Sequence, residues 1–147
     1  MKLAVGADHG GFARKGPLVR WLKKEGHAVT DVGTHGEEPV DYPDFAAQVA
    51  RRVARGACAR GILLCGTGIG MAIAANKVPG VRAAVAWSVE TARLAAEHNK
   101  ANVLCLGGRQ FNSRQIQAMV KAWLSTPFGG GRHERRVKKI MALEKSC

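Results

Sequence analysis

The sequence predicts a doubly wound α/β fold, in which a five-stranded parallel sheet lies between two layers of helices. Five short apolar runs recur along the 147-residue chain, and the intervals of roughly 20 to 35 residues between their starts leave room for crossover helices. Glycines cluster where these runs end, as expected for loops at the edge of such a sheet. A chain of this length can bury one core, so we expect a single domain over residues 1–147 with a Rossmann-like, three-layer architecture.

Local patterns give the expected elements. Strands are expected at residues 2–6, 28–32, 61–65, 82–86 and 102–106, where apolar and β-branched residues dominate. Helices are expected at residues 11–25, 44–55, 70–75, 88–98 and 113–124. Ser88 and Ser113 are the expected N-caps, and Gly26 stops the first helix.

Two breaks interrupt these patterns. Gly16-Pro17 lies inside the first helical pattern, so that helix either is kinked there or begins only at Gly16. Thr-Pro-Phe-Gly-Gly-Gly at 126–131 ends the fifth helix and precedes a basic C-terminal helix at 132–145. That last helix can dock on a neighbouring subunit as readily as on its own domain.

The net charge of +12 favours an anionic partner. The basic residues are spread over several segments, however, and no RNA-binding aromatic motif or zinc finger accompanies them. We therefore expect no nucleic-acid partner, and a site for a phosphate ester on a solvated basic surface. Lysines and arginines outside the candidate sites are expected at the surface.

The four cysteines, at positions 58, 65, 105 and 147, form no C-x-x-C pair and have no histidine at metal-ligand spacing. A metal site is not expected. The apolar start of the chain is too short for a signal peptide, and no apolar stretch approaches the length of a membrane span. We expect a cytoplasmic protein without membrane contact.

The most informative segment runs from a strand through a glycine-rich turn into a helix, with Cys65 at the end of the strand and the sequence Gly-Thr-Gly-Ile-Gly after it. Backbone N–H groups at a helix N-terminus stabilise oxyanions and thiolates. The turn is therefore a candidate reaction centre. The alternative is that Cys65, like the other three cysteines, is only a small buried apolar residue.

Known glycine motifs do not fit this turn. A dinucleotide-binding G-x-G-x-x-G would need a small residue at Met71 in one register or at Ile73 in the other. A P-loop would need a following Gly-Lys-Ser/Thr, and a low-molecular-weight tyrosine phosphatase would need arginine where Met71 stands. The interpretation that remains for this turn is a thiol beside a set of backbone N–H donors.

Two further groups carry acid–base chemistry. Asp8-His9-Gly10-Gly11 follows the first strand, at the edge where ligands bind in open α/β sheets, although an ordinary Asx turn also explains it. His98-Asn99 ends the fourth helix, where a histidine either compensates the helix dipole or transfers protons.

A third group is basic and suits a phosphate monoester. Arg132 and Arg136 share one face of the C-terminal helix by i, i+4 spacing, with His133 beside them. Guanidinium groups bind phosphate oxygens in bidentate fashion, and Arg109 after a Gly-Gly pair adds a third.

Together these residues resemble the family of type B ribose-5-phosphate isomerases and the related galactose- and allose-6-phosphate isomerases. The matching blocks span nearly the whole chain in order: GADHGGF (6–12), DYPDFA (41–46), GILLCGTGIGMAIAANK (61–77), PGVRAA (79–84), EHNKANVLCLGGR (97–109) and GGRHERRV (130–137). The resemblance implies aldose–ketose isomerisation through a cis-enediolate, without metal or organic cofactor.

The resemblance also implies roles for residues. Cys65 is similar to the base that moves a proton between C1 and C2, Thr67 to the hydroxyl that assists at the substrate oxygens, and His98 to the group that opens the furanose ring. The N–H groups of the turn glycines are expected to hold the enediolate charge. The implied substrate-binding residues are Asp8, His9, Tyr42, Gly66, Gly68, Gly70, Asn99, Arg109, Arg132, His133 and Arg136.

In the family the phosphate-binding set comes partly from a partner subunit, so the resemblance implies a homodimer with a shared site, and dimers can pair into tetramers. Gly16-Pro17 and Trp87 depart from the usual pattern of the family, and Trp87 leaves the choice between five- and six-carbon sugars open. A non-catalytic phosphosugar or nucleic-acid binder and a cysteine hydrolase are the competing functions.

Overall fold

The computed structural model describes residues 1–146 as a three-layer α/β fold around a five-stranded sheet with strand order β2-β1-β3-β5-β4. All four strand pairings are parallel. The strands are β1 (Lys2–Ala7), β2 (Ala28–Asp31), β3 (Arg60–Cys65), β4 (Ala83–Val85) and β5 (Val103–Gly107). The helices are α1 (Phe12–Lys24), α2 (Tyr42–Ala54), α3 (Ile69–Ala75), α4 (Val89–Glu97), α5 (Ser113–Ser125) and α6 (Arg132–Ala142), and a 3-10 turn follows at Leu143–Lys145. The predicted doubly wound fold is confirmed.

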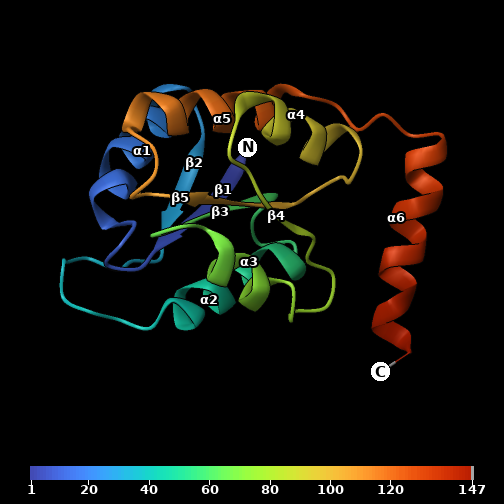
Figure 1. Cartoon of the computed structure of the whole chain (residues 1–147), viewed down its shortest axis with the longest axis horizontal. Coiled ribbons are helices and arrows are strands. Elements are labelled where there is room, and N and C mark those ends of the chain that lie inside the picture. The colour runs from blue at the N-terminus through green and yellow to red at the C-terminus, as the bar shows by residue number, and fades with distance from the viewer. Residues whose placement is uncertain (147) are drawn as a thin grey trace.

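Alternating residues of the strands bury two separate cores. Leu3 and Val5 of β1 face the core beneath α1, α4 and α5, whereas Ala4 faces the core beneath α2 and α3. Figure 1 shows these two helix layers on opposite sides of the sheet. Because both faces are covered, the central strands read as continuous apolar runs, which is the pattern that identifies them in the sequence.

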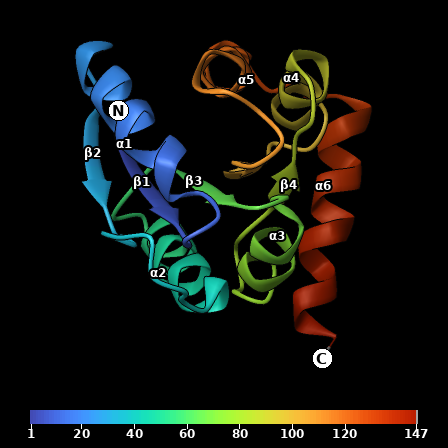
Figure 2. The same ribbon diagram turned by 60° about the vertical axis from the view of Figure 1, so that its left-hand side comes forward.

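Helix α6 stands at one end of the molecule, apart from both helix layers (Figure 1), and in Figure 2 it runs beside α3 and β4. Its anchor is the segment before β4: the Arg82 guanidinium contacts the Met141 sulfur at 3.3 Å, and the Glu144 carboxylate accepts the Gly80 N–H at 2.8 Å. Among the residues that the structure describes, none of the helices has the length and apolar character to cross a membrane.

One of the two predicted N-caps is confirmed and one is wrong. The Ser88 side chain accepts a hydrogen bond from the Thr91 N–H at 3.0 Å, as expected for a cap. The cap of α5 is Asn112 and not Ser113, because the Asn112 carbonyl oxygen accepts the Gln115 N–H and the Gln115 side chain accepts the Asn112 N–H, both at 2.9 Å.

The Gly16-Pro17 pair does not delay the first helix, which begins at Phe12. Pro17 lies inside the helix and lacks the N–H that would bond the Ala13 carbonyl. The adjacent turn carries Lys15, whose ammonium group pairs with the Asp31 carboxylate at the end of β2.

The expectation that all lysines and arginines outside the candidate sites lie at the surface is wrong for Lys15. Its side chain is buried, and its Nζ lies 2.6 Å from the Asp31 carboxylate, which also accepts the Gly33 N–H at 2.9 Å. Burial raises the pKa of Asp31, but the hydrogen bonds from Lys15 and Gly33 and the charge of Lys15 outweigh it, so this pKa lies below the ordinary 3.8.

The substitution Asp31→Asn should lower the free energy of unfolding by about 3 kcal/mol, the lower end of the range for a broken buried pair, because Lys15 is then left uncompensated. Urea denaturation at neutral pH measures this loss. The difference from wild type should shrink as the pH falls below about 3.8, because the wild-type carboxyl loses its charge as the pH passes its folded pKa. The exposed Asp41→Asn is the matched control and should change stability by less than about 0.5 kcal/mol.

Candidate active site

The loops after β1, β3 and β5 meet at the carboxyl edge of the sheet. The Asp8 N–H bonds the Leu64 carbonyl at 3.1 Å, and the Gly108 N–H bonds the Cys65 carbonyl at 2.7 Å. The Arg109 N–H completes the junction with the Gly66 carbonyl at 3.3 Å. Three segments far apart in the sequence therefore form one continuous backbone surface.

Glycines make this junction possible because the backbones lie too close for side chains. A Cβ atom at Gly10 would lie 2.9 Å from the Gly66 nitrogen, and one at Gly108 would lie 2.9 Å from the Gly10 carbonyl oxygen. A Cβ at Gly11 would overlap the Leu64 carbonyl. The glycines at the strand ends therefore have two effects: they let the loops pack closely against one another, and they leave backbone N–H groups uncovered by side chains.

Cys65 ends β3 with its side chain almost completely buried. Its Sγ atom accepts a hydrogen bond from the Gly68 N–H at 3.0 Å. Gly68 is the N-cap of α3, and its φ of 84° lies in the left-handed region that favours glycine. A backbone donor aimed at the sulfur stabilises the thiolate form.

Thr67 and Tyr42 flank this turn. Thr67 is exposed, and its hydroxyl oxygen accepts the Ile69 N–H at 3.3 Å. The ring of Tyr42 at the start of α2 lies over Gly70, where an added Cβ would stand 2.6 Å from a ring carbon. Tyr42 keeps 40% of its surface exposed, and its ring forms one wall of the turn.

Asp8 is buried and forms the Asx turn that the sequence allowed. Its Oδ1 accepts the N–H groups of Gly10 at 2.8 Å and Gly11 at 3.1 Å, while Oδ2 accepts none from the described residues. The neighbouring His9 accepts the Val40 N–H at its Nδ1, at 3.1 Å. This bond leaves Nε2 of His9 as the donor nitrogen.

The remaining predicted site residues form a second cluster. His98 follows α4, and its ring stacks on that of His133 in the first turn of α6, with centroids 4.1 Å apart. Arg132 and Arg136 flank His133 on α6 and are exposed, as is Asn99. Partial burial and the charges of His98, Arg132 and Arg136 lower the pKa of His133.

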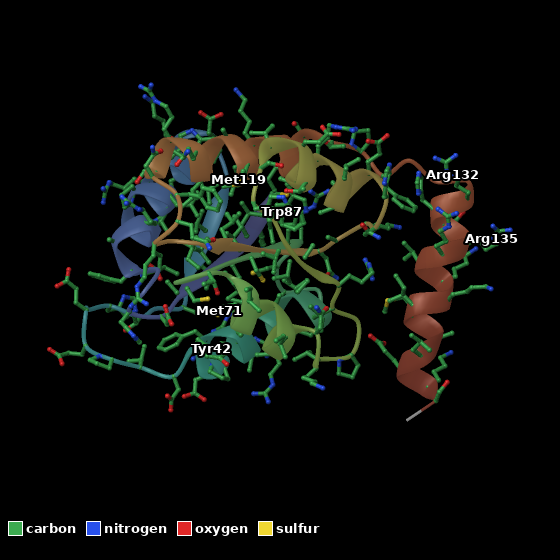
Figure 3. All side chains as sticks on the ribbon, viewed as in Figure 1. Tyr42, Met71, Trp87, Met119, Arg132 and Arg135 are labelled. Carbon is green, nitrogen blue, oxygen red and sulfur yellow. The ribbon has the colours of Figure 1, made fainter. Side chains whose placement is uncertain are left out.

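The two clusters lie at opposite edges of the sheet. Val103 of β5 pairs with Gly61, whereas Gly107 pairs with Cys65, so the strands separate the end of α4 from the turn by roughly 13 Å along their length. His98 lies five residues before Val103 and belongs to the amino edge. In Figure 3 Tyr42, on α2, and Arg132, on α6, lie toward opposite ends of the molecule. Within one chain the structure does not bring Cys65 and His98 together.

Two arginines outside the predicted site residues support these clusters. Arg14 donates from Nε to the Gly108 carbonyl at 3.2 Å and so holds the loop that carries Arg109. Arg82 donates to the Lys100 carbonyl from Nε at 3.0 Å and from Nη2 at 2.9 Å, which fixes the loop that follows His98. In the sequence, the only sign of these two arginines was their position: Arg82 lies within the family-matching segment 79–84, and Arg14 lies just after the matching segment 6–12.

The other described cysteines belong to the core. Cys58 and Cys105 are buried beneath α2 and α3. Burial and the neighbouring Cys65 raise the pKa of the Cys105 thiol, so it stays neutral. Cys147 lies outside the described residues. Within residues 1–146 no group of three or more His, Cys, Asp or Glu side chains is arranged to hold a metal ion.

Comparison with known proteins agrees with this architecture. The family model described as Ribose/Galactose Isomerase matches residues 3–140. Ribose-5-phosphate isomerase B of Escherichia coli K12 is 46% identical over 143 residues, which cover 97% of this chain and 96% of that protein. The solved structure of the Clostridium thermocellum ribose-5-phosphate isomerase B has a TM-score of 0.98 at 51% identity, with 99% of each chain covered.

A further solved structure contains a ligand. Ribose-5-phosphate isomerase B from Mycoplasma genitalium, with bound ribulose-5-phosphate, has a TM-score of 0.96 at 41% identity and covers 99% of this chain and 97% of its own. The fold, the thiol-bearing turn and these matches define an isomerase. The chain belongs to the ribose/galactose isomerase family.

The substitution Gly11→Ala should disrupt the junction at the carboxyl edge, because the new methyl group meets the Leu64 carbonyl and the backbone must move. We expect a loss of about 1–3 kcal/mol in the free energy of unfolding, measured by urea denaturation, together with reduced isomerase activity.

The matched control for this variant is Gly36→Ala. A Cβ atom at Gly36 would meet no atom within 4 Å, and Gly36 does not have a positive φ. The control should change the free energy of unfolding by less than about 0.5 kcal/mol. Equal losses in both variants would contradict the close-approach explanation.

Proposed function

We propose that this protein interconverts ribose 5-phosphate and ribulose 5-phosphate through a cis-enediolate, with Cys65 as the base. The observation that carries the proposal is the hydrogen bond from the Gly68 N–H to the Cys65 sulfur at the carboxyl edge. A thiolate held there can take the proton from C2 of the open-chain aldose and return it to C1. The relative with bound ribulose-5-phosphate supports the choice of sugar.

The groups around the thiol suit the charge that develops during this reaction. Proton removal leaves an enediolate, whose oxygens need donors that are already oriented. We assign that role to the N–H groups of Gly66, Gly68 and Gly70 and to the hydroxyl of Thr67. No new side chain has to approach for these donors to act, because the turn is preformed.

Sugar hydroxyls are assigned to Asp8, Tyr42 and Asn99. Asp8 suits this role because Oδ1 already accepts two backbone N–H groups, which orients the carboxylate and leaves Oδ2 for the substrate. Phosphate oxygens are assigned to His9, through its donor nitrogen Nε2, and to Arg109.

We further propose that the active unit is a homodimer in which the second cluster of one copy completes the site of the other. His98 would open the furanose ring, which requires acid–base help because the cyclic sugar has no carbonyl. Arg132, His133 and Arg136 would bind the phosphate. The parallel topology supports this arrangement, because it keeps these residues away from Cys65 of their own chain.

Exposed apolar side chains support association of two copies. Ile69 and Ile73 on α3, next to the thiol-bearing turn, are 56% and 60% exposed. Ile140 and Leu143 at the end of α6 are also exposed and line a groove of about 700 Å³ between α6 and β4, together with Asn99. Both halves of the proposed composite site thus carry apolar surface that a second copy can bury.

A six-carbon phosphosugar is the second candidate substrate. The family description includes galactose, and Trp87, which follows β4 at the carboxyl edge, is 65% exposed and large enough to limit the length of the sugar. An assay of ribose, allose and galactose phosphates under the same conditions distinguishes these substrates. A cytoplasmic location stays a prediction from the sequence.

The substitution Cys65→Ala should lower kcat at least about 100-fold, the usual effect of removing a positioned acid–base group, with little effect on folding. Coupled assays of ribulose 5-phosphate formation and circular dichroism check both parts. Cys58→Ala removes a buried thiol at the amino edge and should keep near-normal turnover. Near-normal turnover in Cys65→Ala would overturn the thiolate mechanism.

Mixing two inactive variants tests the shared site. Unfolding and refolding Cys65→Ala together with His98→Asn should restore about a quarter of wild-type activity, because half of the dimers are mixed and each mixed dimer has one intact site. The control pair Cys65→Ala with Thr67→Ala alters the same half-site and should stay inactive. Absence of complementation in the first mixture, or its presence in the second, would contradict the composite site.

A further inference from the structure

The peptide unit that joins Gly108 to Arg109 is held on both sides at the carboxyl edge of the sheet. Its carbonyl oxygen accepts a hydrogen bond from Nε of Arg14 at 3.2 Å, across a large separation in the sequence. Its N–H group donates to the Gly66 carbonyl at 3.3 Å. Both polar groups of this one peptide unit are therefore paired, and the unit cannot rotate without breaking both bonds.

The direction of the Arg109 side chain depends on this peptide unit. Arg109 is exposed, yet its side chain lies against the thiol-bearing turn, because a Cβ atom at Gly66 would be 3.2 Å from Nη1 of Arg109 and 3.5 Å from its Cδ. A glycine at position 108 lets the peptide unit rotate at low steric cost. Gly108 is buried, and a buried carbonyl without a partner is costly, so loss of the Arg14 donor favours such a rotation.

Arg14 can hold this carbonyl because the first turn of α1 is itself fixed. A Cβ atom at Gly11, the residue before the helix, would overlap the Leu64 carbonyl, so the start of α1 lies directly against β3. Lys15, next to Arg14, pairs with the Asp31 carboxylate at 2.6 Å. The Nε atom of Arg14 is therefore carried by a segment that is anchored to the sheet at two points.

We propose that Arg14 is a positioning residue for phosphate binding, which orients Arg109 through the Gly108 carbonyl and does not itself touch the phosphate. This inference rests on the proposed function, which assigns phosphate oxygens to Arg109 and His9. It requires the hydrogen-bond donor of Arg14 and does not require its positive charge.

Two substitutions of similar length separate the donor from the charge. The Nε2 atom of glutamine is as many bonds from Cα as Nε of arginine, so Arg14→Gln keeps a donor for the Gly108 carbonyl without the charge. Arg14→Met places a methyl group there and removes both. KM for ribose 5-phosphate should rise at least about tenfold in Arg14→Met, the scale of one hydrogen bond to a charged group, and stay within about threefold of wild type in Arg14→Gln. In both variants kcat should stay within about threefold, because the lost interaction is with a part of the substrate that does not react.

The matched control is Arg20→Met, which removes the same charge from an exposed position on α1 and should leave KM unchanged. Equal losses in Arg14→Gln and Arg14→Met would show that the charge matters and would overturn the proposal.

A double-mutant cycle with Arg109→Met tests whether the effect passes through Arg109. Phosphate binding is measured without any assay of activity, as the dissociation constant of inorganic phosphate obtained from the rise in Tm with its concentration at constant ionic strength. Arg14→Met should raise this constant at least about tenfold in the wild-type background and less than about twofold in the Arg109→Met background. Equal effects in both backgrounds would show that Arg14 binds the phosphate independently and would overturn the positioning role.

Failure of the proposed function would look different. A wild-type protein without ribose 5-phosphate isomerase activity would remove the proposed function, whereas the phosphate-binding cycle would still decide whether Arg14 acts through Arg109. Unchanged phosphate binding in Arg14→Met, or no phosphate binding by the wild-type protein, would overturn the positioning role even in an active isomerase.

Discussion

Each crossover helix in a parallel sheet carries the chain from the carboxyl edge of one strand back to the amino edge of the next. Loops that follow strands therefore gather at one edge, and loops that precede strands gather at the other. In this protein Cys65 follows β3, whereas His98 precedes β5, and the register of these two strands fixes the distance between them. The division of the predicted site into two clusters follows from this constraint, and so does the need for a second copy in the proposed reaction.

Backbone contact between glycines determines the geometry of the carboxyl edge. The backbone of Gly10 and Gly11 lies in close contact with β3 and with the turn that follows it. Gly108, which follows β5, lies in close contact with both glycines. These contacts are between main-chain atoms, so they fix the backbone segments that carry the thiol, the Asp8 carboxylate and Arg109. Such preorganisation suits a reaction in which charge moves but few atoms do.

The sequence predicted the layers of the fold well because parallel strands covered on both faces are marked by apolar runs and glycine-rich ends. It did not predict the buried ion pair of Lys15 with Asp31, because a lysine in a helical pattern carries no sign of what it meets across the layer. The N-cap of α5 was missed by one residue, since Asn112 and Ser113 are both good caps and only the backbone decides between them.

For the site, sequence patterns identified the candidate residues but not their distribution between two edges. The resemblance gathered His98 with Cys65 in one list of residues, although the strands expected at 61–65 and 102–106 already put Cys65 after one strand and His98 before another. Arg82 was missed because its partners cannot be read from its neighbours in the sequence. Its role is to hold the Lys100 carbonyl and the end of α6, and both of these partners are remote in the sequence.

The hydrogen bond from the Gly68 N–H to the Cys65 sulfur has a consequence for the proposed chemistry. In the proposed mechanism the reaction starts from the thiolate, and the Gly68 N–H donates a hydrogen bond to its sulfur. When the thiolate takes a proton from the sugar, that charge moves to the enediolate oxygens, while the neutral thiol needs the donor less. The same turn can then serve the substrate with the N–H groups of Gly66, Gly68 and Gly70. Charge thus passes between two atoms within one fixed set of donors, so the turn has little reorganisation to perform as the barrier is crossed.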